Sequence, residues 1–191
     1  LHMPLKFLLA APKDTSLARV TSPDGRIAFE IHDGRFGTKT YTVRFAGETV
    51  IRDAQLGMRF RTQAGFDRGL EVGEVSFSSH DETWEQPWGE RRLVRDRHEE
   101  ILVAISDEAG RIFRLRVRVF DDGLGFRYEF PEASGLGQVE IVDELTEFAL
   151  PAGSTAWWIP GRRYNRYEYL YKTGGFEDIG LAHTPFTIRT P

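Results

Sequence analysis

The sequence contains no cysteine among its 191 residues. Disulfide scaffolds, thiol catalysis and cysteine-ligated zinc are therefore excluded. No apolar run approaches the roughly 20 residues that a membrane-spanning helix requires, so we expect no membrane partner. The formal net charge is −4. Phosphate recognition usually requires a basic surface, so we expect no nucleic-acid partner either.

Several motifs with a known chemical role are also missing. There is no nucleotide-binding glycine motif, no P-loop and no Gly-x-Ser-x-Gly nucleophile elbow. Acidic pairs are frequent, but adjacent residues of a strand point to opposite faces, so such a pair cannot easily act together on a sugar. We interpret these pairs as solvated: Glu99–Glu100, Asp121–Asp122 and Asp143–Glu144. The histidines lack metal-ligand spacing. His2 is interpreted as vector-derived, and the others are interpreted as structural or surface residues: His32, His80, His98 and His183.

What the sequence does contain is a repeated alternation of apolar and polar residues. The clearest case is "RIFRLRVRVF" (111–120), in which apolar residues alternate with arginines. A period of two is typical of a strand with one face in the core and the other in water. The same pattern in segments 26–34, 40–45 and 125–130 completes the predicted inward set: Ile27, Phe29, Ile31, Tyr41, Val43, Phe45, Phe113, Leu115, Val117, Val119, Phe126, Tyr128 and Phe130.

Turn signals rich in Gly and Asp separate these segments, at 32–37, 46–48, 106–110 and 121–125. Residues 99–120 therefore read as one long hairpin, which residues 121–130 extend into a meander. No segment has sustained helical spacing, and the best helix candidate, 141–150, reads equally well as a strand. The sequence predicts an all-β domain built as a large antiparallel sandwich.

The segment "TWEQPWGERR" (83–92) places Trp84 and Trp88 on either side of Pro87, in an irregular turn that cannot be a central strand. In one interpretation a tryptophan is presented to a sugar ring, because aromatic faces stack on sugars. In the other, both indoles plug the open end of the sandwich. The second is favoured, because large aromatic side chains are mostly buried.

A second aromatic stretch is "AWWIPGRRYNRYEYLY" (156–171), in which Pro160–Gly161 ends a strand. On a strand, the tyrosines at 167, 169 and 171 would share one face, and Glu168 would point the other way with Arg166 and Leu170. Glu168 is then either half of a surface ion pair with Arg166 or a ligand for a hard cation such as calcium. No EF-hand loop occurs, so a calcium site would have to be completed by ligands from elsewhere.

The two ends of the sequence are irregular. The first residues look partly like a vector-derived remnant, although Leu5–Ala11 could also be the stub of a signal sequence. At the other end, "PFTIRT" (185–190) reads as a strand lacking its partner. We therefore expect this chain to be a fragment of a longer protein.

Taken together, the motifs resemble the N-terminal domain of glycoside hydrolase family 97. They are "SPDGRIAFEI", "ETWEQPWGERR", "VFDDGLGFRYEF", "AWWIPG", "YEYLY" and "HTPFTIRT", in that order, from about Val20 to Thr190. Members of the family are multidomain α-glucosidases and α-galactosidases. The resemblance implies an N-terminal β-super-sandwich of the galactose-mutarotase type at 20–191. A leader remnant and an N-terminal extension would precede it at 1–19. A catalytic (β/α)₈ barrel would then follow.

The resemblance also implies specific roles. The catalytic residues would lie on the barrel, so this chain alone should be inactive. Glu168 would donate one ligand to an active-site calcium ion, which this chain alone would not hold. Substrate contacts are expected at the aromatic run: Trp157, Trp158, Tyr167 and Tyr169. The expected partners are the barrel of the same polypeptide and an α-linked oligosaccharide, in a periplasmic or secreted bacterial protein.

Two other functions are compatible with a β-sandwich. The first is a stand-alone carbohydrate-binding module that uses exposed tryptophans as a stacking platform: Trp84, Trp88, Trp157 or Trp158. The second is an enzyme similar to aldose epimerases, which needs a His and a Glu facing one cleft. The scattered histidines make the second the weaker of the two.

Overall fold

The computed structural model describes residues 16–161 and 167–191. Within these ranges the chain forms β-strands and short 3-10 turns and contains no α-helix, which confirms the predicted all-β class. No helix in the described ranges is long and apolar enough to cross a membrane.

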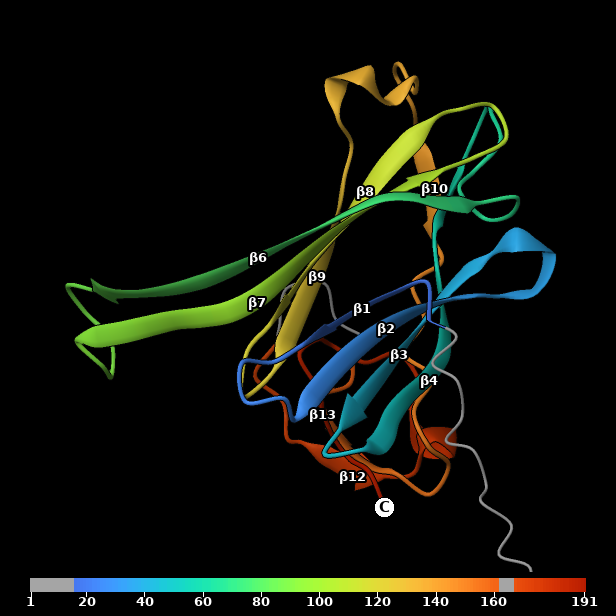
Figure 1. The fold of residues 1–191 in the computed structure, drawn as a ribbon. Coiled ribbons are helices and arrows are strands. Elements are labelled where there is room, and N and C mark those ends of the chain that lie inside the picture. Colours follow the sequence, from blue (N-terminus) through green and yellow to red (C-terminus); the bar gives the residue numbers. More distant parts are fainter. Residues whose placement is uncertain (1–15, 162–166) are drawn as a thin grey trace, which may run out of the picture.

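Every strand pairing in the described residues is antiparallel. The strands are β1 (Ala18–Thr21), β2 (Ile27–Asp33), β3 (Lys39–Phe45), β4 (Glu48–Leu56), β5 (Met58–Phe60), β6 (Glu71–Glu85), β7 (Leu93–Ser106), β8 (Ile112–Val119), β9 (Leu124–Glu129), β10 (Ile141–Glu144), β11 (Thr155–Trp158), β12 (Lys172–Gly174) and β13 (Thr187–Arg189). The 3-10 turns are η1 (Arg35–Gly37), η2 (Glu132–Ser134) and η3 (Phe176–Asp178). The strands form two four-stranded sheets, β1-β2-β3-β4 and β6-β7-β8-β9, a pair β10-β5, and a three-stranded sheet β12-β11-β13 (Figure 1).

The core lies between the two four-stranded sheets. Phe29 and Tyr41 of the first sheet stack with ring centroids 5.2 Å apart, and Phe126 of the second sheet meets both rings at 5.9 and 5.4 Å. The alternating side chains of β8 are fully buried, as predicted: Phe113, Leu115, Val117 and Val119. Burial of such side chains is the main stabilising contribution in a sandwich of this kind.

Two residues of the predicted inward set are exposed instead. Phe45 is 46% exposed and Phe130 is 43% exposed. Phe45 is the last residue of β3, and Phe130 follows the end of β9. The guanidinium of Arg26 lies 5.6 Å from the ring of Phe45 and partly covers it. Alternation continues to the end of a strand, whereas the facing sheet that would bury the last side chain does not.

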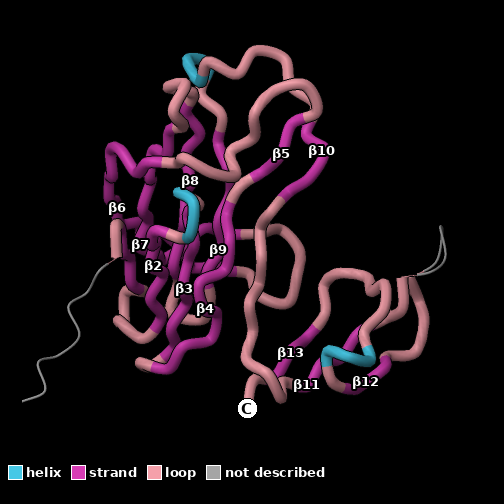
Figure 2. The backbone as a smooth tube through the Cα atoms, turned by 90° about the vertical axis from the view of Figure 1, so that its right-hand side faces the viewer, coloured by secondary structure: helices cyan, strands magenta, loops and turns pink. Residues whose placement is uncertain are grey.

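The predicted meander is present, because β7 pairs with β8 and β8 pairs with β9. The ambiguous segment 141–150 begins as strand β10, which pairs with β5. The chain then runs beside β4: the N–H of Glu147 donates to the carbonyl of Gln55 at 3.0 Å, and that of Arg52 to the carbonyl of Ala149 at 3.1 Å. This path leads into the small sheet β12-β11-β13, which lies apart from the two large sheets (Figure 2).

Candidate functional site

The small sheet carries the aromatic run on its central strand, β11. Successive residues of a strand point to opposite faces, so the two tryptophans differ in environment. Trp158 is 3% exposed, and its indole offers almost no surface to a ligand. Trp157 is half-buried, and the guanidinium of Arg189 on β13 lies 5.4 Å from its ring centroid. One of the two tryptophans thus supports the sheet, and the other lies closer to solvent beneath an arginine.

The expectation that the C-terminal apolar alternation lacks a partner is wrong. Thr187–Arg189 forms β13 and pairs with β11, with Ile188 opposite Ala156. The partner lies more than 30 residues earlier in the sequence, so no local pattern could reveal it. This pairing holds the last residues of the chain against the sheet that carries the tryptophans.

The tyrosine-rich segment 167–171 is not a strand. The N–H of Tyr169 donates to the carbonyl of Tyr167 at 2.9 Å, which closes a tight turn, and β12 begins only at Lys172. The predicted sharing of one face by alternate tyrosines is therefore wrong. Tyr167 is 43% exposed and Leu170 is 91% exposed. The carboxylate-bearing residue Glu168 is also exposed. Arg166, the predicted ion-pair partner of Glu168, lies outside the described residues.

His183 lies next to this turn, a position that the sequence did not indicate. Its ring meets the ring of Tyr167 edge-on at 5.3 Å, and its backbone N–H donates to the carbonyl of Ile159 at 3.0 Å. Within the described residues, the Nε2 atom of His183 and the hydroxyl of Tyr169 are both buried without a hydrogen-bond partner. Such atoms are rare in folded proteins unless water, an ion or another polar group satisfies them. Two buried polar atoms, one on the turn that carries Glu168 and one on the histidine packed against it, are thus suited to a bound water or another polar group.

A metal site is not complete within the described residues. No group of three or more His, Asp or Glu residues in the ranges 16–161 and 167–191 is arranged to hold a metal ion. Calcium takes six to eight oxygen ligands. The exposed carboxylate of Glu168 could therefore supply one ligand to such an ion, and the others would have to come from another part of a larger protein.

The tryptophan turn differs from the favoured expectation. Trp84 is 47% exposed and Trp88 is 82% exposed, so the prediction that both indoles plug the sandwich is wrong. The turn is defined by its backbone: the N–H of Gln86 donates to the carbonyl of Arg92 at 2.9 Å, and Gly89 adopts a φ of +121°. The indoles are exposed because the hairpin β6-β7 extends beyond the rest of its sheet, as Figure 1 shows.

The acidic pair Glu99–Glu100 also differs in part from expectation. The two residues do point to opposite faces, but Glu100 is only 8% exposed. Burial would raise the pKa of Glu100, but hydrogen bonds and charge from Arg118 and Arg116 hold the pKa of this carboxyl below its usual range. Arg118 donates to Glu100 at 2.7 Å, and Arg116 donates to it as well. Glu100 is thus a structural ion-pair residue and not a solvated acid.

The family profile described as "Glycosyl-hydrolase 97 N-terminal" matches residues 20–191. A "Probable retaining alpha-galactosidase" of Streptomyces bingchenggensis is 32% identical over 133 residues, covering 70% of this chain and 20% of the relative. A variant "Glycoside Hydrolase Family 97 enzyme" of Pseudoalteromonas sp. strain K8, solved with panose, is 43% identical with a TM-score of 0.85. That match covers 91% of this chain and 27% of the other.

A further solved structure, a beta-arabinopyranosidase, has a TM-score of 0.68 at 24% identity over 75% of this chain and 23% of its own, which shows a shared fold alone. The chain therefore spans about a fifth of the curated relative and about a quarter of the solved ones.

Proposed function

This chain belongs to glycoside hydrolase family 97, and on that premise we propose that it is a non-catalytic N-terminal domain of a calcium-dependent α-glycosidase. In this proposal the domain supports a catalytic (β/α)₈ barrel of the same polypeptide and donates one glutamate, Glu168, to a calcium ion at the active site. The parent enzyme would act on α-linked oligosaccharides in the periplasm or outside the cell. The solved relative bound to panose supports this substrate class.

The observation that carries the proposal is the surface around Glu168. Glu168 is exposed, and within the described residues the hydroxyl of Tyr169 and the Nε2 atom of His183 are buried without hydrogen-bond partners. An unsatisfied buried polar atom costs about 1–3 kcal/mol, so we expect water or a further polar group to satisfy each of them. A barrel packed on the surface that carries Glu168 would supply the remaining ligands of the metal.

The roles of the residues follow from their chemistry. Calcium, when bound, orients sugar hydroxyls and polarises the reacting centre. Glu168 would contribute one negatively charged oxygen ligand. The exposed ring of Tyr167 and the half-buried indole of Trp157 are suited to stack on a sugar at the edge of the pocket. Trp158, which is 3% exposed, would support the small sheet and would not contact the sugar.

The central test uses the full-length enzyme with Glu168→Gln, which keeps the shape of the side chain and removes its charge. We expect calcium affinity, measured by isothermal titration calorimetry, to fall at least about tenfold, with turnover falling in parallel. Far-UV circular dichroism should be unchanged. Glu177→Gln, an exposed glutamate of η3 in the same part of the chain, is the matched control. If Glu168→Gln retains wild-type calcium affinity and turnover, Glu168 does not belong to the site.

A second test concerns activity. We expect this chain alone to hydrolyse neither nitrophenyl α-glucoside nor nitrophenyl α-galactoside, because no catalytic residue is proposed within it. Measurable turnover by the isolated chain would refute the non-catalytic role.

One observation favours a second candidate function, a stand-alone carbohydrate-binding module. Trp88 is 82% exposed and Trp84 is 47% exposed, which leaves both indoles available to stack on a sugar. Tryptophan fluorescence titrated with maltose or galactose separates the two functions. Saturable quenching in this chain that is abolished by Trp88→Ala would favour the binding module. No change up to millimolar sugar would favour the domain of a larger enzyme.

A further inference from the structure

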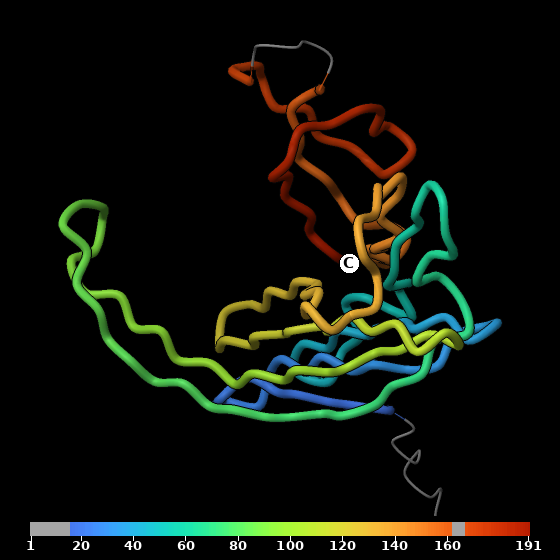
Figure 3. The backbone as a smooth tube through the Cα atoms, turned by 90° about the horizontal axis from the view of Figure 1, so that it is seen from above, coloured from blue at the N-terminus to red at the C-terminus, as the bar shows by residue number. Residues whose placement is uncertain are grey.

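The hairpin β6-β7 continues well beyond the sheet to which it belongs. Its pairing extends from Glu71 opposite Ser106 to Glu85 opposite Leu93, whereas β8 pairs with β7 only as far as Glu99. Among the described residues, no further strand of the sheet pairs with residues 80–98, which therefore form a two-stranded ribbon, here called the arm. Figure 3 shows the arm projecting from the body and curving toward the side on which β11, β12 and β13 lie.

The base of the arm is attached to the body by specific contacts. His98 is 3% exposed, and its ring packs on Phe120 of the body with ring centroids 4.9 Å apart. Within the arm, it also packs on His80 of the facing strand at 5.1 Å. Arg97 donates to the carboxylate of Asp121 at 3.4 Å. These contacts hold the arm in one direction relative to the sandwich.

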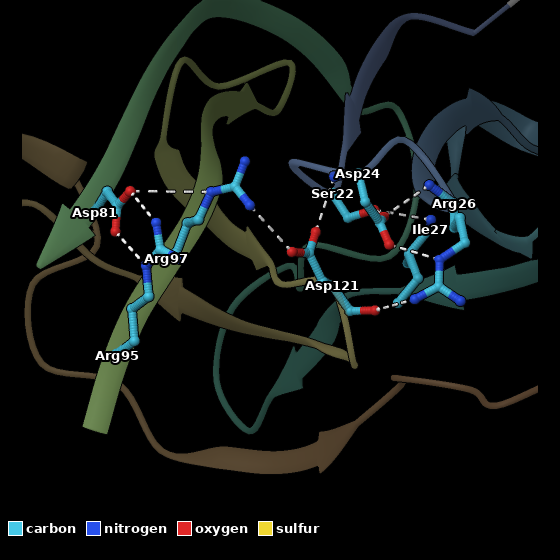
Figure 4. A network of polar contacts seen from close by, with 8 residues as sticks. All are labelled: Ser22, Asp24, Arg26, Ile27, Asp81, Arg95, Arg97 and Asp121. Atoms are coloured by element: carbon cyan, nitrogen blue, oxygen red, sulfur yellow. Dashed lines mark hydrogen bonds and ion pairs between the residues drawn. The ribbon is translucent and has the colours of Figure 1, made fainter. Parts of the chain in front are cut away.

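Figure 4 shows two further sets of contacts made by charged residues, one within the arm and one between Asp121 and the turn after β1. Arg95 donates to both oxygens of Asp81 across the ribbon, at 2.7 and 2.6 Å. Asp121 also accepts the backbone N–H of Asp24 at 2.8 Å, which connects the turn after β8 to the turn after β1. The arm is thus an ordered extension of the sheet, and hydrogen bonds between charged side chains join its two strands.

The far end of the arm carries large apolar side chains in contact with solvent. Trp84 is 47% exposed, Trp88 is 82% exposed and Leu93 is 53% exposed. An isolated two-stranded hairpin is at best marginally stable in water. Exposed tryptophans on a projecting element are typical of binding hot spots, because they desolvate a large area at a low cost in conformational entropy. The tip of the arm is therefore suited to pack against a partner.

The location of the rest of the family's polypeptide indicates which partner. This chain matches the N-terminal part of the family and covers 27% of the solved relatives, so most of their chain follows the matched part. The last strand, β13, lies on the side toward which the arm curves (Figure 3). Leu170 is 91% exposed and Leu181 is 67% exposed in this C-terminal part. A domain that continues from here would lie between two apolar surfaces.

We propose that the arm is a clasp that packs its tryptophan tip against the catalytic domain that follows in the same polypeptide. The clasp rests on the proposed function, because it takes that domain as its partner. It adds a second point of attachment, distant from Glu168. Two separate attachments would restrict rocking between the domains.

The experiment compares backbone hydrogen exchange of residues 80–98 in the full-length enzyme and in this chain alone. We expect exchange at the tip of the arm to be at least about tenfold slower in the full-length enzyme. The double variant Trp84→Ser/Trp88→Ser should lose that protection and should split a single thermal unfolding transition into two. Phe36→Ser is the matched control, because Phe36 is 89% exposed on a different loop. It should change neither result.

Several outcomes would overturn the clasp. One is equal exchange of the arm in the two proteins. A second is protection that appears only as the protein concentration rises, which would identify a second copy as the partner. A third is protection that appears only on adding maltose, which would identify a sugar platform. Calcium titration separates the clasp from the proposed function. The arm variant should bind calcium with the affinity of the wild type. A Glu168→Gln variant with unchanged calcium affinity and a protected arm would refute the metal role of Glu168 and leave the clasp standing.

Discussion

The hydroxyl of Tyr128 connects three separate parts of the chain, which makes Tyr128→Phe an informative perturbation. Tyr128 lies on β9 and is largely buried. Its oxygen accepts the backbone N–H of Gly57 at 3.1 Å and lies 2.8 Å from the hydroxyl of Thr146, which in turn donates to Glu144 at 2.8 Å. This chain of hydrogen bonds holds β5 and the segment leading to the small sheet against the second large sheet.

The magnitude follows from what the substitution leaves behind. Phenylalanine retains the ring packing against Phe113 at 5.6 Å, so no cavity forms. The buried N–H of Gly57, however, loses its acceptor, and an unsatisfied buried donor costs about 1–3 kcal/mol. Tyr41→Phe is the matched control. The hydroxyl of Tyr41 donates at 2.6 Å to the carbonyl of Glu147, so Tyr41→Phe removes one hydrogen bond and leaves no buried donor unsatisfied, at an expected cost of about 0.5–1.5 kcal/mol.

The assay is equilibrium unfolding in urea at neutral pH, supported by thermal melts. For a chain of this size a loss of 2 kcal/mol lowers Tm by roughly 4–8 °C. Burial raises the pKa of Tyr128 above its ordinary value of 10.0, so the neutral phenol stabilises the fold fully below about pH 10 and progressively less as the pH rises through the raised pKa. The difference between wild type and Tyr128→Phe should therefore shrink above pH 10. A Tyr128→Phe variant that loses no more stability than Tyr41→Phe would refute the reasoning.

Three further results are expected. Leu115→Ala should lower the free energy of unfolding in urea by about 2–5 kcal/mol, because the side chain is fully buried in the core. The Arg116 guanidinium lowers the pKa of Glu129 to about 2, so its contribution to stability is complete above about pH 5 and is lost as the pH falls toward 2. Glu129→Gln should therefore flatten the acid limb of a stability-versus-pH curve, and an unchanged limb would count against this pairing. Gly57→Ala should destabilise by more than about 2 kcal/mol in the same assay, since a Cβ at its φ of +136° would lie 2.1 Å from the carbonyl oxygen of Phe66.

Local pattern was a good guide to the strands and a poor guide to their ends. The alternation around Phe113 identified the buried face of β8 correctly, because side-chain direction along a strand depends only on neighbouring residues. The same rule failed for Phe45, because burial also requires a facing sheet that extends as far. The prediction that the tyrosines at 167 and 169 share one face failed for a different reason, because a tight turn replaces the strand that this prediction requires.

Parts of the candidate site lay beyond any local pattern. Glu168 was singled out from the sequence by its aromatic neighbours and by resemblance to a family, and its exposure agrees with a group able to reach a partner. No periodic pattern or motif in the sequence relates His183 to Tyr167. Only the folding of the last 30 or so residues brings the centroids of the two rings to 5.3 Å from each other. The burial of Glu100 is of the same kind, because it requires Arg116 and Arg118 from the next strand.

The sequence by itself determined the all-β class, the meander and the family, because alternation, turn residues and ordered motifs are properties of neighbouring residues. Only the tertiary structure decided that β13 completes the small sheet and that β6 and β7 extend past their sheet. It also decided that Tyr169 and His183 bury polar atoms that have no hydrogen-bond partner in the described part of the chain. The reason is physical. Whether a side chain is covered depends on how far the strands beside and opposite it extend, and those strands are distant in the sequence. The exposure of Trp84 and Trp88 is therefore a consequence of the length of β8 as much as of the turn that contains them.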